Sequence, residues 1–429
     1  MRICLVAASS RPYDIKIVRD FSAALQEIGY NSIWLSSPLS DKKLDAFAIH
    51  NSISIFVRIN RLPPAEERKS KYKHISWFQD VFPTTNANIA NLQDGDLAVT
   101  LGANLGLKIP DKFYAGSMTT YVNPEEFKLL PTKNDHTYDF NLIGFIPRIL
   151  KQHPQYSDVF VEPLNIIKIK LLTYLSHAAK KLAKGEIYLP KKEGILSLLN
   201  FKNFLSICHD EQLPLNKEKY SDFEGYLMRL SNKHHELVRG TLNIQEFEKK
   251  IRDDVETEEL FNDDLIDFIV REMPRYLDRV FIARELLQVS KNFVIAGQNW
   301  KNYGLFKNNA IGEIGYPKSL ELFRNSKITL QNNNHGLGIH SRTLSCMATG
   351  GFVFSHSSPR DYDAGGLKTA FEPGVHYGEF TEANIKSEAN RWLQDDIRRL
   401  KVAENAKKKV LNEFTWKQGA IHFAKCCQL

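Results

Sequence analysis

The sequence predicts an α/β protein with two doubly wound lobes, the second of which carries a helical insertion. Three observations favour this class. Short apolar runs alternate with amphipathic stretches in the first part of the chain. The same alternation begins again at Tyr138 and resumes at Phe293, after a lysine- and glutamate-rich stretch. The length of 429 residues exceeds the usual size of one hydrophobic core, which favours two domains.

The first lobe begins with Arg2–Ala8, an apolar run suited to a buried parallel strand. Apolar side chains then recur every three or four residues, which predicts an amphipathic helix over the stretch from Ile15 to Ile28. Gly29 follows where a C-terminal capping glycine belongs. Further strands are predicted at Ser32–Leu35, Ile53–Ile59, Ile75–Phe78 and Leu97–Leu101.

The second lobe is predicted from four more apolar runs, at Tyr138–Gly144, Phe293–Gly297, Ile328–Gln331 and Phe352–Ser355. Helical periodicity between about residues 147 and 274 predicts the insertion, and the chain from Thr381 onward is predicted to be helical. The predicted domains are therefore 1–128, then 129–415 with its insertion at about 147–274, and a C-terminal helix at 416–429 that could cross back to the first lobe. The insertion could shape the choice of a substrate, mediate a homodimer or simply stiffen its lobe.

Composition and charge narrow the function classes. The net charge of +7 could attract phosphates, anionic lipid or nucleic acid, but the basic residues are spread along the chain and nucleic-acid binding is not indicated. No apolar run approaches the roughly 20 residues that span a bilayer. The five cysteines lack metal-ligand spacing and suggest reduced thiols. We expect a cytoplasmic protein, with a peripheral position at the inner face of the membrane as a variant of that location.

The segment Ile328–His356 is the most informative part of the sequence for chemistry. A strand leads into a loop with Gly336 and Gly338, and a helix is predicted to start near Ser341. A glycine-bearing loop before a helix N-terminus offers free N–H groups and the positive end of a helix dipole, which together suit an anion. Arg342 could add a bidentate contact to a phosphate. The alternative is an ordinary strand–loop–helix unit. In that case Arg342 reaches a surface carboxylate, and the flanking His335 and His340 are structural.

Several motifs are consistent in their order and spacing with one known family. They are Trp77–Asp80 (WFQD), Val122–Phe127 (VNPEEF), Tyr138–Gly144 (YDFNLIG), Tyr316–Ile328 (YPKSLELFRNSKI), Ser341–Phe352 (SRTLSCMATGGF) and Phe371–Tyr377 (FEPGVHY). From about Tyr121 to the C-terminus, the insertion left out, the chain resembles the CgeB-like branch of the GT-B glycosyltransferases. The resemblance implies two Rossmann-like lobes facing a cleft and the transfer of a sugar from a nucleoside diphosphate to an acceptor.

The resemblance also implies roles for particular residues. Gly297 and Gln298 would lie near the donor, Tyr316 near its nucleobase, and Gly338, Ser341 and Arg342 near its diphosphate. The donor-binding set is completed by His335, Gly336, Thr343 and Ser345. Ser345 is a departure, because relatives carry there a glutamate that would hold the donor ribose. Enzymes of this kind generally need no bound metal or other cofactor, since positive side chains and a helix N-terminus stabilise the leaving diphosphate.

The acceptor side would need a general base if the reaction inverts the sugar configuration, and none if it retains it. Asp80 and Asp14 each follow a predicted strand and are the candidates, and each could equally be a helix cap. Two Asp-x-Asp pairs, Asp94–Asp96 and Asp361–Asp363, fit glycine-flanked turns better than metal sites. We therefore predict no metal.

The sequence leaves three other functions open. The first is a nucleotide-sugar-binding protein without activity, which Ser345 would suit. The second is another two-lobed enzyme, such as an epimerase or a dehydrogenase, and the stretch AASSRPYD after the first strand lacks the glycine-rich fingerprint of a dehydrogenase. The third is a sugar transferase acting on nucleic acid, which only the positive charge supports. The acceptor could be an envelope glycan, a protein or a small molecule.

Overall fold

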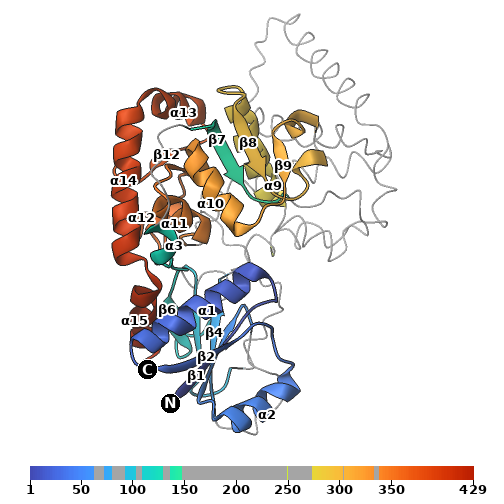
Figure 1. The fold of residues 1–429 in the computed structure, drawn as a ribbon, viewed down its shortest axis with the longest axis vertical. Coiled ribbons are helices and arrows are strands. Elements are labelled where there is room, and N and C mark those ends of the chain that lie inside the picture. Colours follow the sequence, from blue (N-terminus) through green and yellow to red (C-terminus); the bar gives the residue numbers. More distant parts are fainter. Residues whose placement is uncertain are drawn as a thin grey trace, which may run out of the picture. The chain divides into compact units, whose positions relative to one another are not determined.

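A computed structural model describes residues 1–61, 72–79, 92–102, 109–128, 136–146, 249, 273–302, 304–332 and 338–429. Two six-stranded sheets with helices confirm the predicted α/β class (Figure 1). The chain divides into two compact units. One comprises Met1–Asn141, Val289–Asn292 and Gly315–Leu429, and the other Leu142–Gln288 and Phe293–Ile314. Most of the predicted insertion at 147–274 lies outside the described residues.

The first sheet has the strand order β2-β1-β3-β4-β5-β6 and is parallel throughout. Its strands are β1 (Arg2–Val6), β2 (Asn31–Leu35), β3 (Ile55–Ile59), β4 (Lys73–Phe78), β5 (Leu97–Thr100) and β6 (Tyr114–Ser117). The five predicted apolar runs are five of these strands. The sixth, β6, has the sequence YAGS with every residue half-buried, so that no apolar run marks it.

Helix α1 (Pro12–Glu27) covers the first sheet with its apolar stripe. Proline at the first helical position suits its start, and Gly29, with φ of +97°, ends it in a conformation that glycine adopts readily. Phe21 is fully buried and its ring lies 5.6 Å from that of Trp77 in β4. The same ring lies 5.1 Å from Phe423 of α15 (Trp416–Cys426), so that the C-terminal helix completes this core beside α1 (Figure 1).

Two further helices belong to this part of the chain. Helix α2 (Asp41–Asn51) packs Leu44 and Ala48 against the face of the sheet that carries Phe56. Helix α3 (Glu125–Lys128) is a single turn that follows the bridge between Val122 and Thr415.

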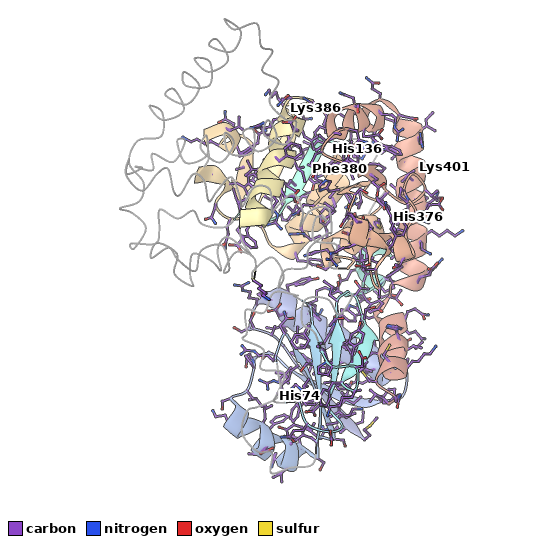
Figure 2. All side chains as sticks on the ribbon, turned by 180° about the vertical axis from the view of Figure 1, so that it is seen from behind. His74, His136, His376, Phe380, Lys386 and Lys401 are labelled. Carbon is purple, nitrogen blue, oxygen red and sulfur yellow. The ribbon has the colours of Figure 1, made fainter. Side chains whose placement is uncertain are left out.

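The second sheet has the strand order β12-β11-β10-β7-β8-β9. Its strands are β7 (Tyr138–Ile143), β8 (Phe293–Ala296), β9 (Ala310–Gly312), β10 (Ser326–Gln331), β11 (Val353–His356) and β12 (Gly378–Phe380). The sequence predicted four of them and missed β9 and β12, which have three residues each. Phe380 of β12, which is labelled in Figure 2, is buried. Its ring lies 4.5 Å from that of Phe354 in β11.

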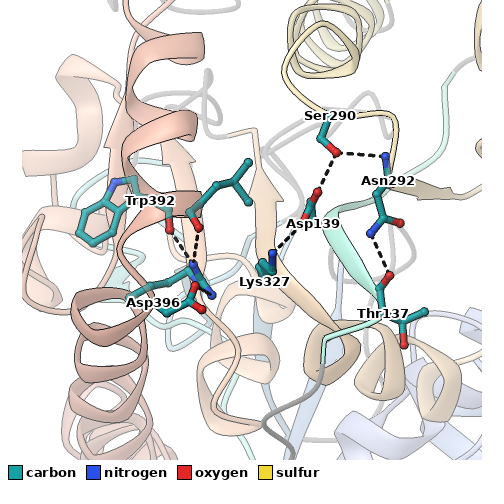
Figure 3. Close-up of polar contacts among 9 residues, drawn as sticks. Thr137, Asp139, Ser290, Asn292, Lys327, Trp392 and Asp396 are labelled. Atoms are coloured by element: carbon teal, nitrogen blue, oxygen red, sulfur yellow. Dashed lines mark hydrogen bonds and ion pairs between the residues drawn. The ribbon is translucent and has the colours of Figure 1, made fainter.

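Polar contacts fix the beginning of β7 (Figure 3). Lys327 of β10 forms an ion pair with Asp139 at 2.9 Å, and the Ser290 hydroxyl donates to the same carboxylate at 2.7 Å. The Asn292 side chain donates to the carbonyl of Thr137 at 3.0 Å. These contacts hold the first residues of β7 in register although they are separated in sequence from their partners.

The remaining helices and short 3-10 segments follow in chain order. They are α9 (Met273–Leu287), η5 (Trp300–Asn302), η6 (Gly304–Phe306), α10 (Tyr316–Asn325), α11 (Ser341–Ala348), η7 (Pro359–Tyr362), α12 (Leu367–Ala370), α13 (Ile385–Gln394) and α14 (Asp396–Glu413). The chain is helical from Ile385, four residues after the predicted start at Thr381, with breaks at Asp395 and at Phe414–Thr415. Buried Arg399 donates to the Trp392 carbonyl at 2.6 Å across the first break (Figure 3).

Candidate functional site

Helix α11 begins at Ser341, as the sequence predicts. The residue before it, His340, caps the helix, because its Nδ1 atom accepts a hydrogen bond from the backbone N–H of Arg342 at 3.1 Å. Ser341 and Arg342 are half-buried in the first turn, while Thr343 is buried at 4% exposure. The first turn therefore presents a hydroxyl and a guanidinium beside the positive end of the helix dipole.

The loop before α11 is held by the carboxyl ends of β5 and β6. Gly338 has φ of +98°, and a Cβ atom there would lie 2.5 Å from the Leu101 carbonyl oxygen that follows β5. The Thr119 hydroxyl, which follows β6, donates to the Ile339 carbonyl at 2.8 Å. The backbone of this loop thus packs directly on the edge of a parallel sheet where ligands of such sheets bind.

Tyr13, at the start of α1, lies against the first turn of α11. Burial raises the pKa of the Tyr13 hydroxyl, and Ser341 and the Arg342 charge oppose that rise. The Tyr13 ring lies 5.8 Å from the ring of Tyr316, the first residue of α10.

Tyr316 joins α10 to α11 and to α3. Its hydroxyl donates to Glu126 Oε2 at 3.2 Å, and Ser345 of α11, which is 6% exposed, lowers the pKa of that hydroxyl. Burial is the main cause of the raised pKa of Tyr316, so that the hydroxyl stays protonated and able to donate. Lys16 Nζ lies 2.7 Å from Glu126 Oε1 and 5.2 Å from the centre of the Tyr316 ring.

The structure therefore brings four predicted donor residues together: Tyr316, Ser341, Arg342 and Ser345. Gly338 lies in the adjoining loop, and Thr343 is on the same helix. Three residues at this place were not predicted as site residues: Tyr13, Lys16 and Glu126. Tyr13 and Lys16 were detectable, because they open the helix after β1 at the carboxyl edge of the sheet. Glu126 was part of the quoted VNPEEF motif.

Gly297 and Gln298 lie in the second unit, directly after β8. Gly297 has φ of +141°, and a Cβ atom there would meet the Gly144 oxygen at 2.2 Å, so that both the backbone conformation and the close packing require a glycine. The Gln298 side chain donates to Glu313 at 2.8 Å. His335, Gly336 and Asp80 lie outside the described residues.

Asp14 lies in the first turn of α1, next to Tyr13. The Ser9 hydroxyl donates to the Asp14 carboxylate, and the same hydroxyl oxygen accepts from the Arg11 backbone N–H at 3.2 Å. The carboxylate therefore orders the loop after β1. Its role as a base stays a prediction.

The two Asp-x-Asp pairs occupy turns. Buried Asp96 accepts hydrogen bonds from the backbone N–H groups of His74 and Gln93, and Gly95 between the two aspartates has φ of +92°. Asp361 forms a capping box with Ser358 at the start of η7. In the part of the chain that the structure describes, no three metal-ligating side chains come together.

A family model described as glycosyl transferase-like matches residues 271–424, which is less than half of the chain. Among curated proteins, none matches. The chain is similar to HepE of Anabaena, solved in complex with UDP-glucose, at 9% identity and a TM-score of 0.47 over 99% of this chain and 98% of that chain. It is also similar to a glycosyltransferase of Rickettsia africae, at 10% identity and a TM-score of 0.46 over 100% and 97%.

A third similar structure is the sucrose-phosphate synthase of Thermosynechococcus elongatus, at 9% identity and a TM-score of 0.42 over 99% of this chain and 98% of that chain. Within the described residues, the helices are all too short or too polar to cross a bilayer.

Proposed function

We propose that the protein is a GT-B glycosyltransferase of the CgeB-like branch, which moves a sugar from a nucleoside diphosphate to an acceptor without a metal ion. The observation that carries the proposal is the family match over residues 271–424, which contains α11 with its glycine-bearing approach, Ser341 and Arg342. The parallel sheets with α15 in the core of the first sheet fit that fold. We further propose a cytoplasmic location.

The geometry at α11 suits the leaving group of such a reaction. As the bond between the sugar and the β-phosphate oxygen breaks, negative charge grows on the diphosphate. The N–H groups at the start of α11 and the Arg342 guanidinium would stabilise that charge, which lowers the barrier. The anomeric carbon then bonds to the acceptor oxygen. Asp14 or Asp80 would take the acceptor proton if the reaction inverts the sugar configuration.

Nucleotide binding is the first measurement. The melting temperature is recorded with UDP, GDP, dTDP, ADP, CMP and NAD, each with and without EDTA. A ligand present at about 100 times its dissociation constant stabilises by about 2.7 kcal/mol, which is a visible shift. We expect a selective rise with one nucleoside diphosphate that EDTA does not reduce, and the Arg342→Ala variant should lose most of that rise.

Lys318→Ala is the matched control, because it removes a positive charge from an exposed position of α10 where Lys318 pairs with Glu321 on the surface. This variant should keep the full response. A protein that melts at the same temperature with every diphosphate would overturn the proposal. A selective response without turnover of the corresponding nucleotide sugar would favour a binding protein that has lost activity.

A further inference from the structure

The loop after β11 folds into a tight turn around a buried carboxyl group. Asp361 has no exposed surface, and its Oδ2 atom accepts from the Ser358 backbone N–H at 2.8 Å. The chain then closes over this group. The Gly366 N–H donates to the Asp363 carbonyl at 2.7 Å, and a Cβ atom at Gly366 would lie 2.5 Å from the Asp361 carbonyl oxygen. Water therefore reaches the carboxyl group only when the turn opens.

The same turn holds the loop that leads into α11. The Ile339 N–H donates to the Gly365 carbonyl at 3.1 Å, and the next residue, His340, caps α11. Gly365 has φ of +74°, and a Cβ atom there would lie 2.9 Å from the Leu101 carbonyl oxygen. Gly338, on the other side of Ile339, approaches the same oxygen. A movement of the turn around Asp361 is therefore passed directly to the backbone before the helix cap.

The cations that face Asp361 are held by other carboxylates. Lys368 of α12 lies 2.7 Å from Glu379 of β12, and His356 of β11 lies 3.4 Å from Glu382. Burial raises the pKa of Asp361 to about 6, the charges of Lys368 and His356 oppose that rise, and Glu379 adds to it. A negative charge at Asp361 thus costs solvation that the paired cations offset only in part. Further titratable or charged side chains in the turn or beside it are Arg360, Tyr362, Asp363 and Tyr377.

We propose, on the basis of the proposed nucleotide-sugar site, that Asp361 is a proton-controlled latch on the loop that leads into α11. With the carboxyl group protonated, the turn stays closed and Gly365 holds the backbone of Ile339. With the carboxyl group ionised, the turn opens so that water reaches the charge, and the hydrogen bond from Ile339 is lost. The nucleoside diphosphate then binds more weakly, so that donor binding is strongest in mild acid.

The first test follows hydrogen exchange of the Ile339 amide at pH 5 and pH 7, corrected for the intrinsic pH dependence of exchange. The Asp361 carboxyl has a pKa of about 6 in the closed turn, and of about 3.9 once it is exposed, so that opening becomes about tenfold more frequent between these pH values. Wild-type protection should fall by that factor. Asp361→Asn, whose amide accepts from Ser358 but does not ionise, should keep the same protection at both pH values.

Asp363→Asn is the matched control for this experiment. Asp363 lies at the end of the same turn, its side chain is 37% exposed, and it pairs with Arg360 at 3.5 Å. Its loss should leave the wild-type pH dependence of Ile339 protection in place. A titration of His356 would change all three proteins alike. Equal pH dependence in wild type and in Asp361→Asn therefore overturns the latch.

The second test measures the dissociation constants of UDP, GDP and ADP by calorimetry at the same two pH values. From pH 5 to pH 7, the wild-type affinity for the nucleotide that binds should fall by about threefold to tenfold more than that of Asp361→Asn. The titration of the diphosphate itself cancels in this comparison. An equal fall in the two proteins overturns the control of donor binding. A wild-type protein that binds none of the three nucleotides, but whose Ile339 protection changes with pH, contradicts the proposed function and leaves the latch standing.

Discussion

Asp361 is a carboxyl group with no exposed surface in the turn after β11. Burial raises its pKa to about 6, while the hydrogen bond from the Ser358 backbone N–H and the charge of Lys368 oppose the rise. The folded protein therefore binds a proton at this carboxyl more tightly than the unfolded chain does. The contribution of the protonated Asp361 carboxyl to the free energy of unfolding is complete below pH 4 and is lost as the pH rises through 6.

Replacing Asp361 with asparagine should remove this pH dependence. The amide oxygen can still accept from Ser358, but the side chain no longer ionises. We expect the difference in unfolding free energy between wild type and Asp361→Asn to change by about 2 kcal/mol between pH 4 and pH 7, in the sense that wild type gains relative stability in acid. Urea denaturation at four pH values measures it. If the unfolding free energies of the two proteins changed in parallel with pH, the raised pKa of Asp361 would be contradicted.

At the scale of elements, the close approach of Gly338 to the end of β5 is open to a paired test. Gly338 and Gly95 have almost the same φ, +98° and +92°, but of the two only Gly338 would place a Cβ atom 2.5 Å from a carbonyl oxygen. Gly95→Ala should lose about 1 kcal/mol of stability from backbone strain alone. Gly338→Ala should lose roughly 1–3 kcal/mol more, since the loop must move away from Leu101.

Both values come from urea denaturation at one pH, and the nucleotide response of each variant is recorded beside them. The Gly338→Ala protein should also respond less to the nucleotide that wild type selects, because the approach to α11 has shifted. Equal losses of stability in the two variants would mean that the contact with Leu101 is not fixed in solution.

Most of the sheet structure could be predicted from local sequence. Apolar runs of four or more residues marked nine strands, because burial between helices requires them. The three strands that escaped are β6, with half-buried small residues, and β9 and β12, with three residues each. In such short or polar strands, pairing with a neighbour far along the chain decides the structure, and no local pattern records it.

The candidate site likewise has one part that local sequence predicts and one part that it does not. The start of α11 was predicted because a glycine-bearing loop and a helix are adjacent in sequence. The hydrogen bond between Tyr316 and Glu126 was not predicted, because the two residues are 190 positions apart in the sequence. A hydrogen bond at that separation depends on how α3 and α10 are placed by the folded chain, and the residue types alone do not specify it.

At the scale of the whole molecule, α15 makes the last residues of the chain part of the first core. Phe423 is fully buried and contacts Phe21 edge to face, whereas Ile421 on the same helix is 46% exposed. Phe423→Ala should lower the unfolding free energy by about 3–5 kcal/mol, and Ile421→Ala by less than about 1 kcal/mol. Chemical denaturation followed by tryptophan fluorescence reports this core, which holds Trp77 and Trp416. Similar losses in the two variants would contradict the packing of α15.

The same helix affects how the protein is made. Among the described residues, the fully buried members of this core run up to Met118 and begin again at Trp416, about 300 residues later. At about 5–20 residues per second, the ribosome needs roughly 15–60 seconds to cover that interval. During this time the nascent sheet has an apolar face without its final helix. Newly synthesised chains should therefore be bound by chaperones until α15 has been made, and termination before α15 should leave a fragment that proteases remove.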